Sequence, residues 1–211
     1  MLQKERGCGK ITDIKGKCCY MGIILASASP RRRELLSLLG LDFRVIVSET
    51  DESIDKNLPV TEEIKRLSYE KAKAAAAKVS GGDIIIAADT AVSLEGKVFG
   101  KPADKKEAFL TLKTLSGKTH EVITGVTVIK GERADTRAAV TKVTFRELSD
   151  AEINAYIATG DPFDKAGGYA IQGVSCIFAT GISGDHFNVY GLPVSMLAQM
   201  LREAGVEILG E

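Results

Sequence analysis

One segment limits the possible fold more than any other, an apolar run over residues 83–88 with the sequence DIIIAA. Its isoleucines and alanines show no polar alternation, which is typical of a central strand covered on both faces. Strand-like and helix-like segments alternate around this run. We predict strands over residues 23–26 and 43–47 and helices over residues 30–39, 61–79 and 104–116. This alternation predicts an α/β fold.

The second half of the chain favours antiparallel pairing. Residues 121–147 are rich in Val and Thr, and Lys130-Gly131-Glu132 has the composition of a hairpin turn. Ser149 and Glu152 make a capping box for a helix that ends near Ala158. Residues 192–204 are predicted to close the chain as a helix.

Composition excludes several classes of function. Lys and Arg together number 28, as do Asp and Glu, so no overall basic field holds nucleic acid or an anionic membrane. No apolar stretch approaches the roughly 20 residues that span a bilayer. The four cysteines, with Cys176 far from the others, form no disulfide framework and indicate reduced thiols. We therefore expect a cytoplasmic protein that binds neither nucleic acid nor a membrane.

We expect one enzyme-sized domain, because 211 residues suffice for a single core or for two small lobes that share a cleft. Residues 1–20 are polar, rich in Lys and Gly, and without clear periodicity, whereas a strand pattern begins at Gly22. The sequence thus predicts a flexible extension over residues 1–20 and a single domain over residues 21–211.

The first candidate site follows the first predicted strand. Ser27 and Ser29 precede Arg31 and Arg32, with Ser29 at the helix N-cap and Pro30 at the first helical position. Backbone N–H groups, the positive end of a helix dipole, hydroxyls and arginines meet there, and each of these binds polyphosphates. The alternative is a capped helix whose arginines are merely solvated.

The second candidate site comes directly after the buried apolar run. Asp89 and Thr90 follow it, at the carboxyl end where α/β sheets place their ligands. A carboxylate there can hold Mg²⁺ or take a proton from water. Lys101 follows shortly, next to a proline that precedes a helix. The alternative for Asp89 is a cap of the turn that ends the strand.

The third candidate site is a glycine-rich segment. Asp164 and Lys165 precede Gly167 and Gly168, whose backbone allows close approach to a charged ligand. Gln172 can read a base edge, because its amide has both a donor and an acceptor. The alternative is a surface turn with an exposed Lys–Asp pair.

Other polar residues have simpler interpretations. Neither His120 nor His186 lies near a Ser or Cys nucleophile motif, so both are expected in packing or surface roles. Lys71, Lys73 and Lys78 follow the wet face of an amphipathic helix, from which one lysine can still point into a cleft.

These segments follow one another in an order that resembles a known family. SASPRRRELL, ADT, GKP, LSGKTHEVITGV and DKAGGYAIQG stand in the order seen in the Maf family of nucleotide pyrophosphatases. The resemblance runs from about Met21 to the GLPVSML segment and leaves residues 1–20 outside it. Gly168 departs from the alanine usual in the family.

The resemblance implies an α/β fold with a mixed sheet flanked by helices and two lobes around a cleft, similar to the inosine triphosphatase architecture. It implies a homodimer that binds a nucleoside triphosphate and hydrolyses it to nucleoside monophosphate and pyrophosphate, a house-cleaning activity. The implied cofactor is Mg²⁺ or Mn²⁺. The AIQG ending at residues 170–173 resembles the dTTP/UTP branch.

The resemblance also implies roles for individual residues. Asp89 matches the family's general base or metal-associated acid, and Glu52 matches its second acid. The basic residues around the phosphates correspond to Arg32, Lys71, Lys101 and Lys165. The positions linked to substrate choice correspond to Arg31, Thr90 and Gln172.

Two other functions stay open on the sequence. A relative that acts on 7-methyl-GTP or another modified nucleotide shares the phosphate chemistry and differs at the base pocket. A nucleotide-sensing regulator of cell division is the alternative from another class, although the acids at positions 52 and 89 argue against an inactive scaffold.

Overall fold

The computed structural model describes residues 10–12, 18–20, 22–47, 50, 53–55, 57–79 and 82–210. Its main element is a seven-stranded sheet in the order β4-β3-β5-β7-β8-β9, with β6 paired to β5. The strands are β3 (Ile23–Leu25), β4 (Phe43–Val45), β5 (Ile84–Leu94), β6 (Lys97–Phe99), β7 (Thr119–Lys130), β8 (Arg133–Phe145) and β9 (Ala179–Ser183). Within the predicted N-terminal extension, β1 (Lys10–Thr12) and β2 (Cys18–Tyr20) pair in a separate small sheet.

The sheet is mixed, as the resemblance implied. β3 runs parallel to both β4 and β5, while β5, β7, β8 and β9 pair antiparallel in succession. Two parallel strands need a crossover connection between them. One helix lies between β3 and β4, and a second lies between β4 and β5. The α/β fold class is therefore confirmed.

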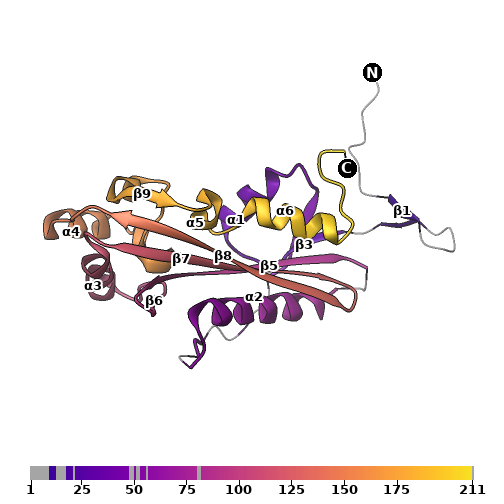
Figure 1. The fold of residues 1–211 in the computed structure, drawn as a ribbon, viewed down its shortest axis with the longest axis horizontal. Coiled ribbons are helices and arrows are strands. Elements are labelled where there is room, and N and C mark those ends of the chain that lie inside the picture. Colours follow the sequence, from indigo (N-terminus) through magenta and orange to yellow (C-terminus); the bar gives the residue numbers. More distant parts are fainter. Residues whose placement is uncertain are drawn as a thin grey trace, which may run out of the picture.

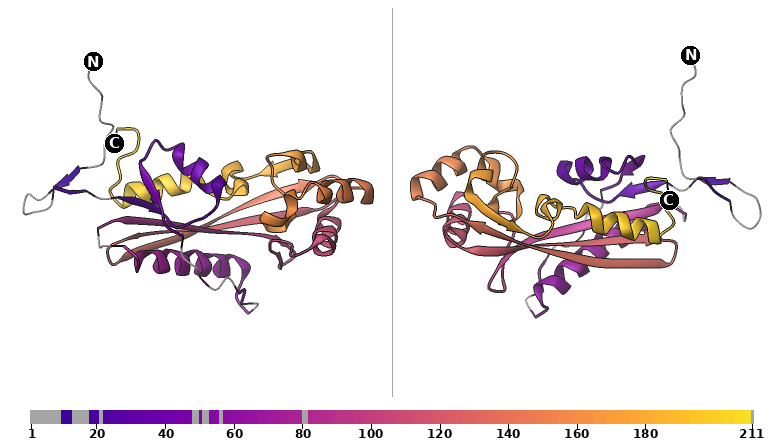
Figure 2. Two further views of the ribbon diagram at one scale, coloured as in Figure 1. Left: turned by 180° about the vertical axis from the view of Figure 1, so that it is seen from behind. Right: turned by 45° about the horizontal axis from the view of Figure 1, so that its top comes forward.

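Helices cover both faces of the sheet (Figures 1 and 2). Helix α2 (Val60–Ala76) packs on one face, and α1 (Pro30–Ser37), α5 (His186–Tyr190) and α6 (Val194–Glu203) lie on the other. Helices α3 (Lys105–Leu115) and α4 (Asp150–Ala158) lie at the far end of the long strands. In the described part of the chain, no helix combines the length and apolar character that crossing a membrane requires.

The described core comprises four clusters of buried residues, of which two contain residues of α2 and two lie towards opposite ends of the sheet. At the α3–α4 end, a cluster of buried side chains includes Leu112, Phe145 and Phe178. Under α1 and α6, a second cluster includes Ile86 and Leu197. Each of the latter two clusters packs its own set of helices, so the two ends form lobes joined by the long strands.

The local signals in the sequence predicted most of these elements. The N-cap of α1 at Ser29 and the capping box of Ser149 and Glu152 are both present. The predicted strand over residues 83–88 is too short, because β5 continues through Asp89 and Thr90 to Leu94. Its backbone there is held by pairing with β7, a long-range contact that overrides the poor strand propensity of aspartate. β6, β9 and α5 were not predicted.

The packing role predicted for His120 is confirmed. Its side chain is buried beside the rings of Phe145 and Tyr169, and its Nε2 atom lies 2.7 Å from the Tyr169 hydroxyl. Burial lowers the pKa of His120 from 6.5 to about 4, since the charged imidazolium is poorly solvated there. His186 is exposed.

This burial predicts a pH dependence of stability. The unfolded chain takes up a proton at His120 as the pH falls through 6.5, whereas the folded protein does so only near 4. The contribution of neutral His120 to the free energy of unfolding is thus fully present above pH 6.5 and is lost as the pH falls towards 4. We expect the free energy of unfolding to fall by about 2 kcal/mol between pH 7 and pH 5 through this group.

Urea unfolding at pH 7, 6 and 5 measures this loss. His120→Gln keeps a polar end for Tyr169 and removes the titration, so its stability should change far less over the same range. An unchanged pH slope in His120→Gln would assign the loss to other groups.

Candidate active site

A cleft of about 620 Å³ lies where the two lobes meet, and it gathers most of the predicted site residues. Those that line it are Ser27, Ser29, Arg31, Arg32, Lys71, Asp89, Thr90, Lys101, Asp164 and Lys165. Gln172 does not line it, although Ala170 does. Glu52 lies outside the described residues, and Ile54, shortly after it, belongs to the cleft wall.

The cleft opens where β5 lacks a neighbouring strand on one edge. β3 pairs with β5 as far as Leu25 and Ile86, and β6 pairs with the same edge from Val92 onwards. Between these pairings the chain after β3 turns away into α1. Asp89 and Thr90 lie in this gap, held from the other edge by β7. Ligands of α/β sheets bind in such crevices, beyond the carboxyl end of a parallel strand.

Strand alternation sends the two polar side chains to opposite faces of β5. Ala87, which has the same parity as Asp89, packs with residues of α2, and Ala88, of the other parity, packs with residues of α1 and α6. Asp89 forms an ion pair with Lys71 of α2, and Thr90 accepts a hydrogen bond from Arg32 of α1. The site is therefore built around β5 from both sides.

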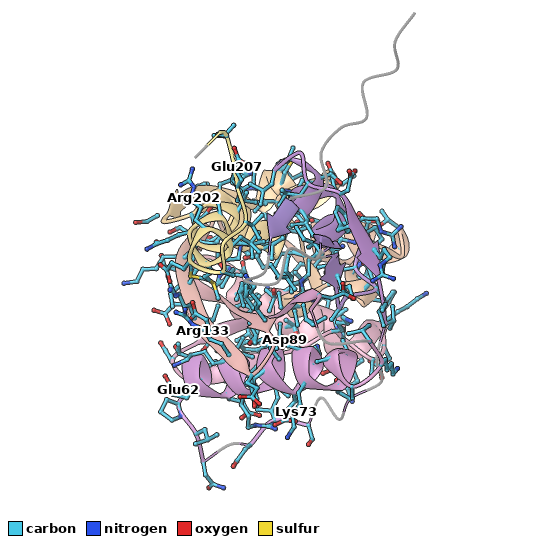
Figure 3. The ribbon with its side chains drawn as sticks, turned by 90° about the vertical axis from the view of Figure 1, so that its right-hand side faces the viewer. Glu62, Lys73, Asp89, Arg133, Arg202 and Glu207 are labelled. Atoms are coloured by element: carbon cyan, nitrogen blue, oxygen red, sulfur yellow. The ribbon has the colours of Figure 1, made fainter. Side chains whose placement is uncertain are left out.

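Lys71 is the lysine of the α2 run that points into the cleft. It and Asp89 are both largely buried, at 13% and 15% side-chain exposure. Lys73 is exposed, and Figure 3 shows it on the outward side of α2 while Asp89 lies inside. Lys73 therefore lies on the solvent-exposed face of α2, as predicted, whereas Lys71 is the lysine that points into the cleft.

Gly125 of β7 explains how close α2 comes to Asp89. Gly125 is paired with Asp89 in the sheet register. A Cβ atom added there would lie 2.5 Å from the carbonyl oxygen of Ile64 in α2. Since real side chains do not approach backbone so closely, glycine is required for α2 to lie against the sheet at this point.

Arg32 is held at three points. Its Nη2 atom donates to the Thr90 hydroxyl over 3.0 Å, and its Nε atom donates to the Gly191 carbonyl over 2.9 Å. Its Nη1 atom lies 3.4 Å from the hydroxyl of Ser27. The N-cap hydroxyl of Ser29 accepts from the Arg32 backbone N–H. This guanidinium is fixed at the start of α1, where the helix dipole also favours anions.

The opposite wall of the cleft comes from the 3-10 turns η1 (Asp161–Asp164) and η2 (Ala166–Gly168). The carboxylate of Asp164 accepts from Arg31 over 3.1 Å and from Lys165 over 2.6 Å. Partial burial raises the pKa of Asp164, but the hydrogen bonds and charges of Lys165 and Arg31 outweigh it and leave that pKa below its usual value. This cluster joins the two walls across the cleft.

Sequence reasoning missed several residues of the site. Tyr169, Tyr190 and Gly191 line the cleft, and Thr124 lies directly behind Thr90. A threonine within the apolar run of β7 is a signal that could have indicated Thr124, because a buried hydroxyl needs a partner. No local pattern marks Gly191, whose role depends on its carbonyl.

The protein thus has an α/β sheet with a cleft in which arginines and lysines from both lobes surround a carboxylate. These features define a class of protein that binds phosphorylated small molecules. Within this class the chain belongs to the Maf-like protein family, whose model matches residues 22–204. The match covers all the candidate site residues.

Curated relatives agree with this assignment. The chain is 48% identical over 190 residues to a dTTP/UTP pyrophosphatase of Desulforamulus reducens, covering 89% of this chain and 98% of that protein. It is 46% identical over 186 residues to a dTTP/UTP pyrophosphatase of Bacillus anthracis, covering 88% and 97%. Among solved structures, it is similar to the Staphylococcus aureus Ham1 protein, with 14% identity, a TM-score of 0.49 and coverage of 88% and 100%.

Proposed function

We propose that this protein hydrolyses pyrimidine nucleoside triphosphates, dTTP and UTP, to nucleoside monophosphate and pyrophosphate. The observation that carries the proposal is the cleft in which Lys71 and Arg32 approach Asp89 and Thr90 from the two faces of one strand. The match to this chain covers almost the whole length of relatives that are named dTTP/UTP pyrophosphatase, and these names support the substrate class.

The charge of the cleft suits a triphosphate. Its described lining includes the cations Arg31, Arg32, Lys71, Lys101 and Lys165 against the carboxylates of Asp89 and Asp164. A triphosphate carries about four negative charges, which must be neutralised before water can approach phosphorus. The volume of the cleft also lies in the range of sites that take a small ligand.

A divalent cation is part of the proposal. Among the described residues, no group of three or more His, Cys, Asp or Glu side chains could hold a metal alone. Mg²⁺ in nucleotide sites commonly binds one or two carboxylates together with substrate phosphates. Asp89 fits this donor set and would hold the cation with the triphosphate. When bound, Mg²⁺ or Mn²⁺ supplies further charge neutralisation at the phosphates.

The residues of the cleft suit attack by water on the α-phosphorus. Asp89 can take the proton of that water, and Lys71 holds the carboxylate in place. Arg32, restrained by Ser27, Thr90 and Gly191, is set to stabilise the charge on the phosphates. The reaction needs no covalent intermediate. Glu52, the second acid implied by the resemblance, stays a proposal.

The deciding experiment is a panel of dTTP, UTP, CTP, GTP and 7-methyl-GTP with Mg²⁺ and with Mn²⁺. Pyrophosphate and orthophosphate are scored separately. Pyrophosphate release from dTTP and UTP at the highest kcat/KM supports the proposal. Preference for 7-methyl-GTP contradicts the pyrimidine assignment, and tight binding without turnover contradicts the enzymatic one in favour of a nucleotide sensor.

Gln172 is proposed to read the base. Gln172 does not line the cleft, but Ala170 two residues before it does, and the buried side-chain oxygen of Gln172 has no hydrogen-bond partner among the described residues. A small shift of this segment would bring that free acceptor to a ligand N–H. Uracil and thymine present N3–H beside a carbonyl, which a carboxamide can meet with one acceptor and one donor. Gln172→Glu is expected to lower kcat/KM for dTTP and UTP by about ten- to a hundredfold, because a carboxylate cannot donate.

The control for this substitution is Gln199→Glu, which makes the same charge change on an exposed residue of α6. It should leave kcat/KM unchanged. Purine triphosphates should lose less than dTTP and UTP in Gln172→Glu. An equal loss for all five nucleotides would show that Gln172 serves the phosphates or the fold instead. The homodimer that the resemblance implies and the cytoplasmic location expected from composition stay predictions.

A further inference from the structure

A chain of hydroxyl groups runs from Arg32 into the core of the sheet. Arg32 Nη2 lies 3.0 Å from Thr90 Oγ1, which lies 3.0 Å from Thr124 Oγ1. Thr124 Oγ1 then donates to the backbone carbonyl of Asn188 over 3.2 Å. Thr90 and Thr124 are direct partners in the β5–β7 register, and Thr124 and Asn188 are fully buried. The chain thus connects cleft residues with buried groups that do not line the cleft.

The direction of every hydrogen bond in this chain is determined. A guanidinium only donates, and a backbone carbonyl only accepts. Each threonine hydroxyl has one proton, so Thr124 donates to Asn188, and Thr90 donates to Thr124 and accepts from Arg32. The Thr90 hydroxyl therefore donates its only proton to Thr124. Its lone pair, which accepts from Arg32, points in a fixed direction.

The far end of the chain is rigidly held. The Asn188 side-chain amide donates over 2.9 Å to both the Val122 carbonyl and the Thr141 hydroxyl. The same turn of α5 also holds Arg32 directly, because the Gly191 backbone N–H donates to the Asn188 carbonyl while the Gly191 carbonyl accepts from Arg32 Nε. Both series of hydrogen bonds that start at Arg32 therefore end at the buried residue Asn188.

We propose that Thr124 is a positioning residue, which fixes the orientation of Arg32 towards the triphosphate through Thr90. The proposal rests on the function proposed above. Thr124 does not line the cleft, so it acts on the reaction only through the direction in which it holds the Thr90 hydroxyl. Without the Thr124 acceptor, the Thr90 proton is free to turn towards other oxygens, and Arg32 loses the fixed direction of one of its three acceptors.

The same strand offers a matched control. Thr127 is also fully buried in β7, and its hydroxyl lies 2.9 Å from Ser68 of α2 and 2.9 Å from Thr136 of β8. None of these hydroxyls bonds to Arg32 in the described structure. Thr127→Val therefore removes a buried hydroxyl and its hydrogen bonds, as Thr124→Val does, without touching the chain to Arg32.

The experiment compares Thr124→Val, Thr124→Ser and Thr127→Val by melting temperature and by kcat/KM for pyrophosphate release from dTTP. Thr124→Val keeps the shape and removes the hydroxyl, so we expect about a tenfold loss of kcat/KM, the loss of one hydrogen bond to a positioned group. Thr124→Ser keeps the hydroxyl and should stay within about twofold of the wild type. Thr127→Val should also stay within about twofold, even with a similar fall in melting temperature.

A second measurement separates positioning from folding. Thr124→Val in an Arg32→Ala background should cause no further loss of kcat/KM, because Thr124 acts through Arg32. If Thr124→Val does not fold, Thr90→Val breaks the same chain nearer the surface and should show the same tenfold loss. An equal loss in Thr124→Val and Thr127→Val, or a full loss that persists without Arg32, would overturn the positioning role alone. A wild-type protein that releases no pyrophosphate would instead overturn the proposed function.

Discussion

Asp89→Asn is expected to keep the fold and to lower kcat by about 10²–10⁴, the range for loss of a general base. The amide can still accept a hydrogen bond from Lys71, so α2 should stay in place against β5. It can neither take a proton from water nor neutralise a cation. The measurement is steady-state pyrophosphate release from dTTP, together with a melting curve to check that the variant is folded.

Asp83→Asn provides the matched control for this variant. Asp83 immediately precedes β5 and also pairs with a cation, accepting from Arg44 over 2.9 Å, but it does not line the cleft. Its substitution should leave turnover near that of the wild type. If Asp89→Asn retains activity within a few-fold, Asp89 is not the base, and the same assay on Glu52→Gln tests the second acid.

Arg32→Ala is the second substitution with a large expected effect, a loss of about 10²–10³ in kcat/KM. The three contacts of its guanidinium place it at the start of α1 before any substrate binds. A donor held in advance stabilises developing charge without reorganising during the reaction, so its loss is costly. The measurement is kcat/KM for dTTP and UTP over a range of metal concentrations.

Arg33→Ala is the control for Arg32→Ala, since it removes the same charge from the next residue of the same helix. Arg33 is exposed and does not line the cleft. Arg33→Ala should lose little activity. If removing a positive charge near the cleft lowers kcat/KM in a general way, this variant will show the loss as well. Comparable losses in the two variants would mean that the cleft attracts nucleotides by its field alone and that the position of Arg32 is unimportant.

Local signals in the sequence were sufficient for much of the fold. The cap at Ser29, the capping box at Ser149 and the turn after Lys130 depend on residues within a few positions of one another, and the structure contains all of them. The chemical candidates were also found locally, because hydroxyls and arginines at a helix start indicate phosphate binding in any fold.

The sequence could not give the end of the central strand. Asp89 and Thr90 look like the start of a turn, yet β5 continues through them because β7 pairs with the whole segment. The apolar run before them is buried on both faces and shows no alternation, so it does not tell which face Asp89 takes.

The sequence by itself therefore determined the class of the fold, the starts of the helices that it predicted and the candidate phosphate-binding residues, since each of these follows from near neighbours. Only the tertiary structure decided how those residues meet: Lys71 with Asp89 on one face of β5, Arg32 with Thr90 on the other, and Arg31 with Asp164 across the cleft. Arg31 and Asp164 are 133 positions apart. Such contacts depend on which strands pair and on the packing of helices against the sheet, and both bring together residues that lie far apart in the sequence.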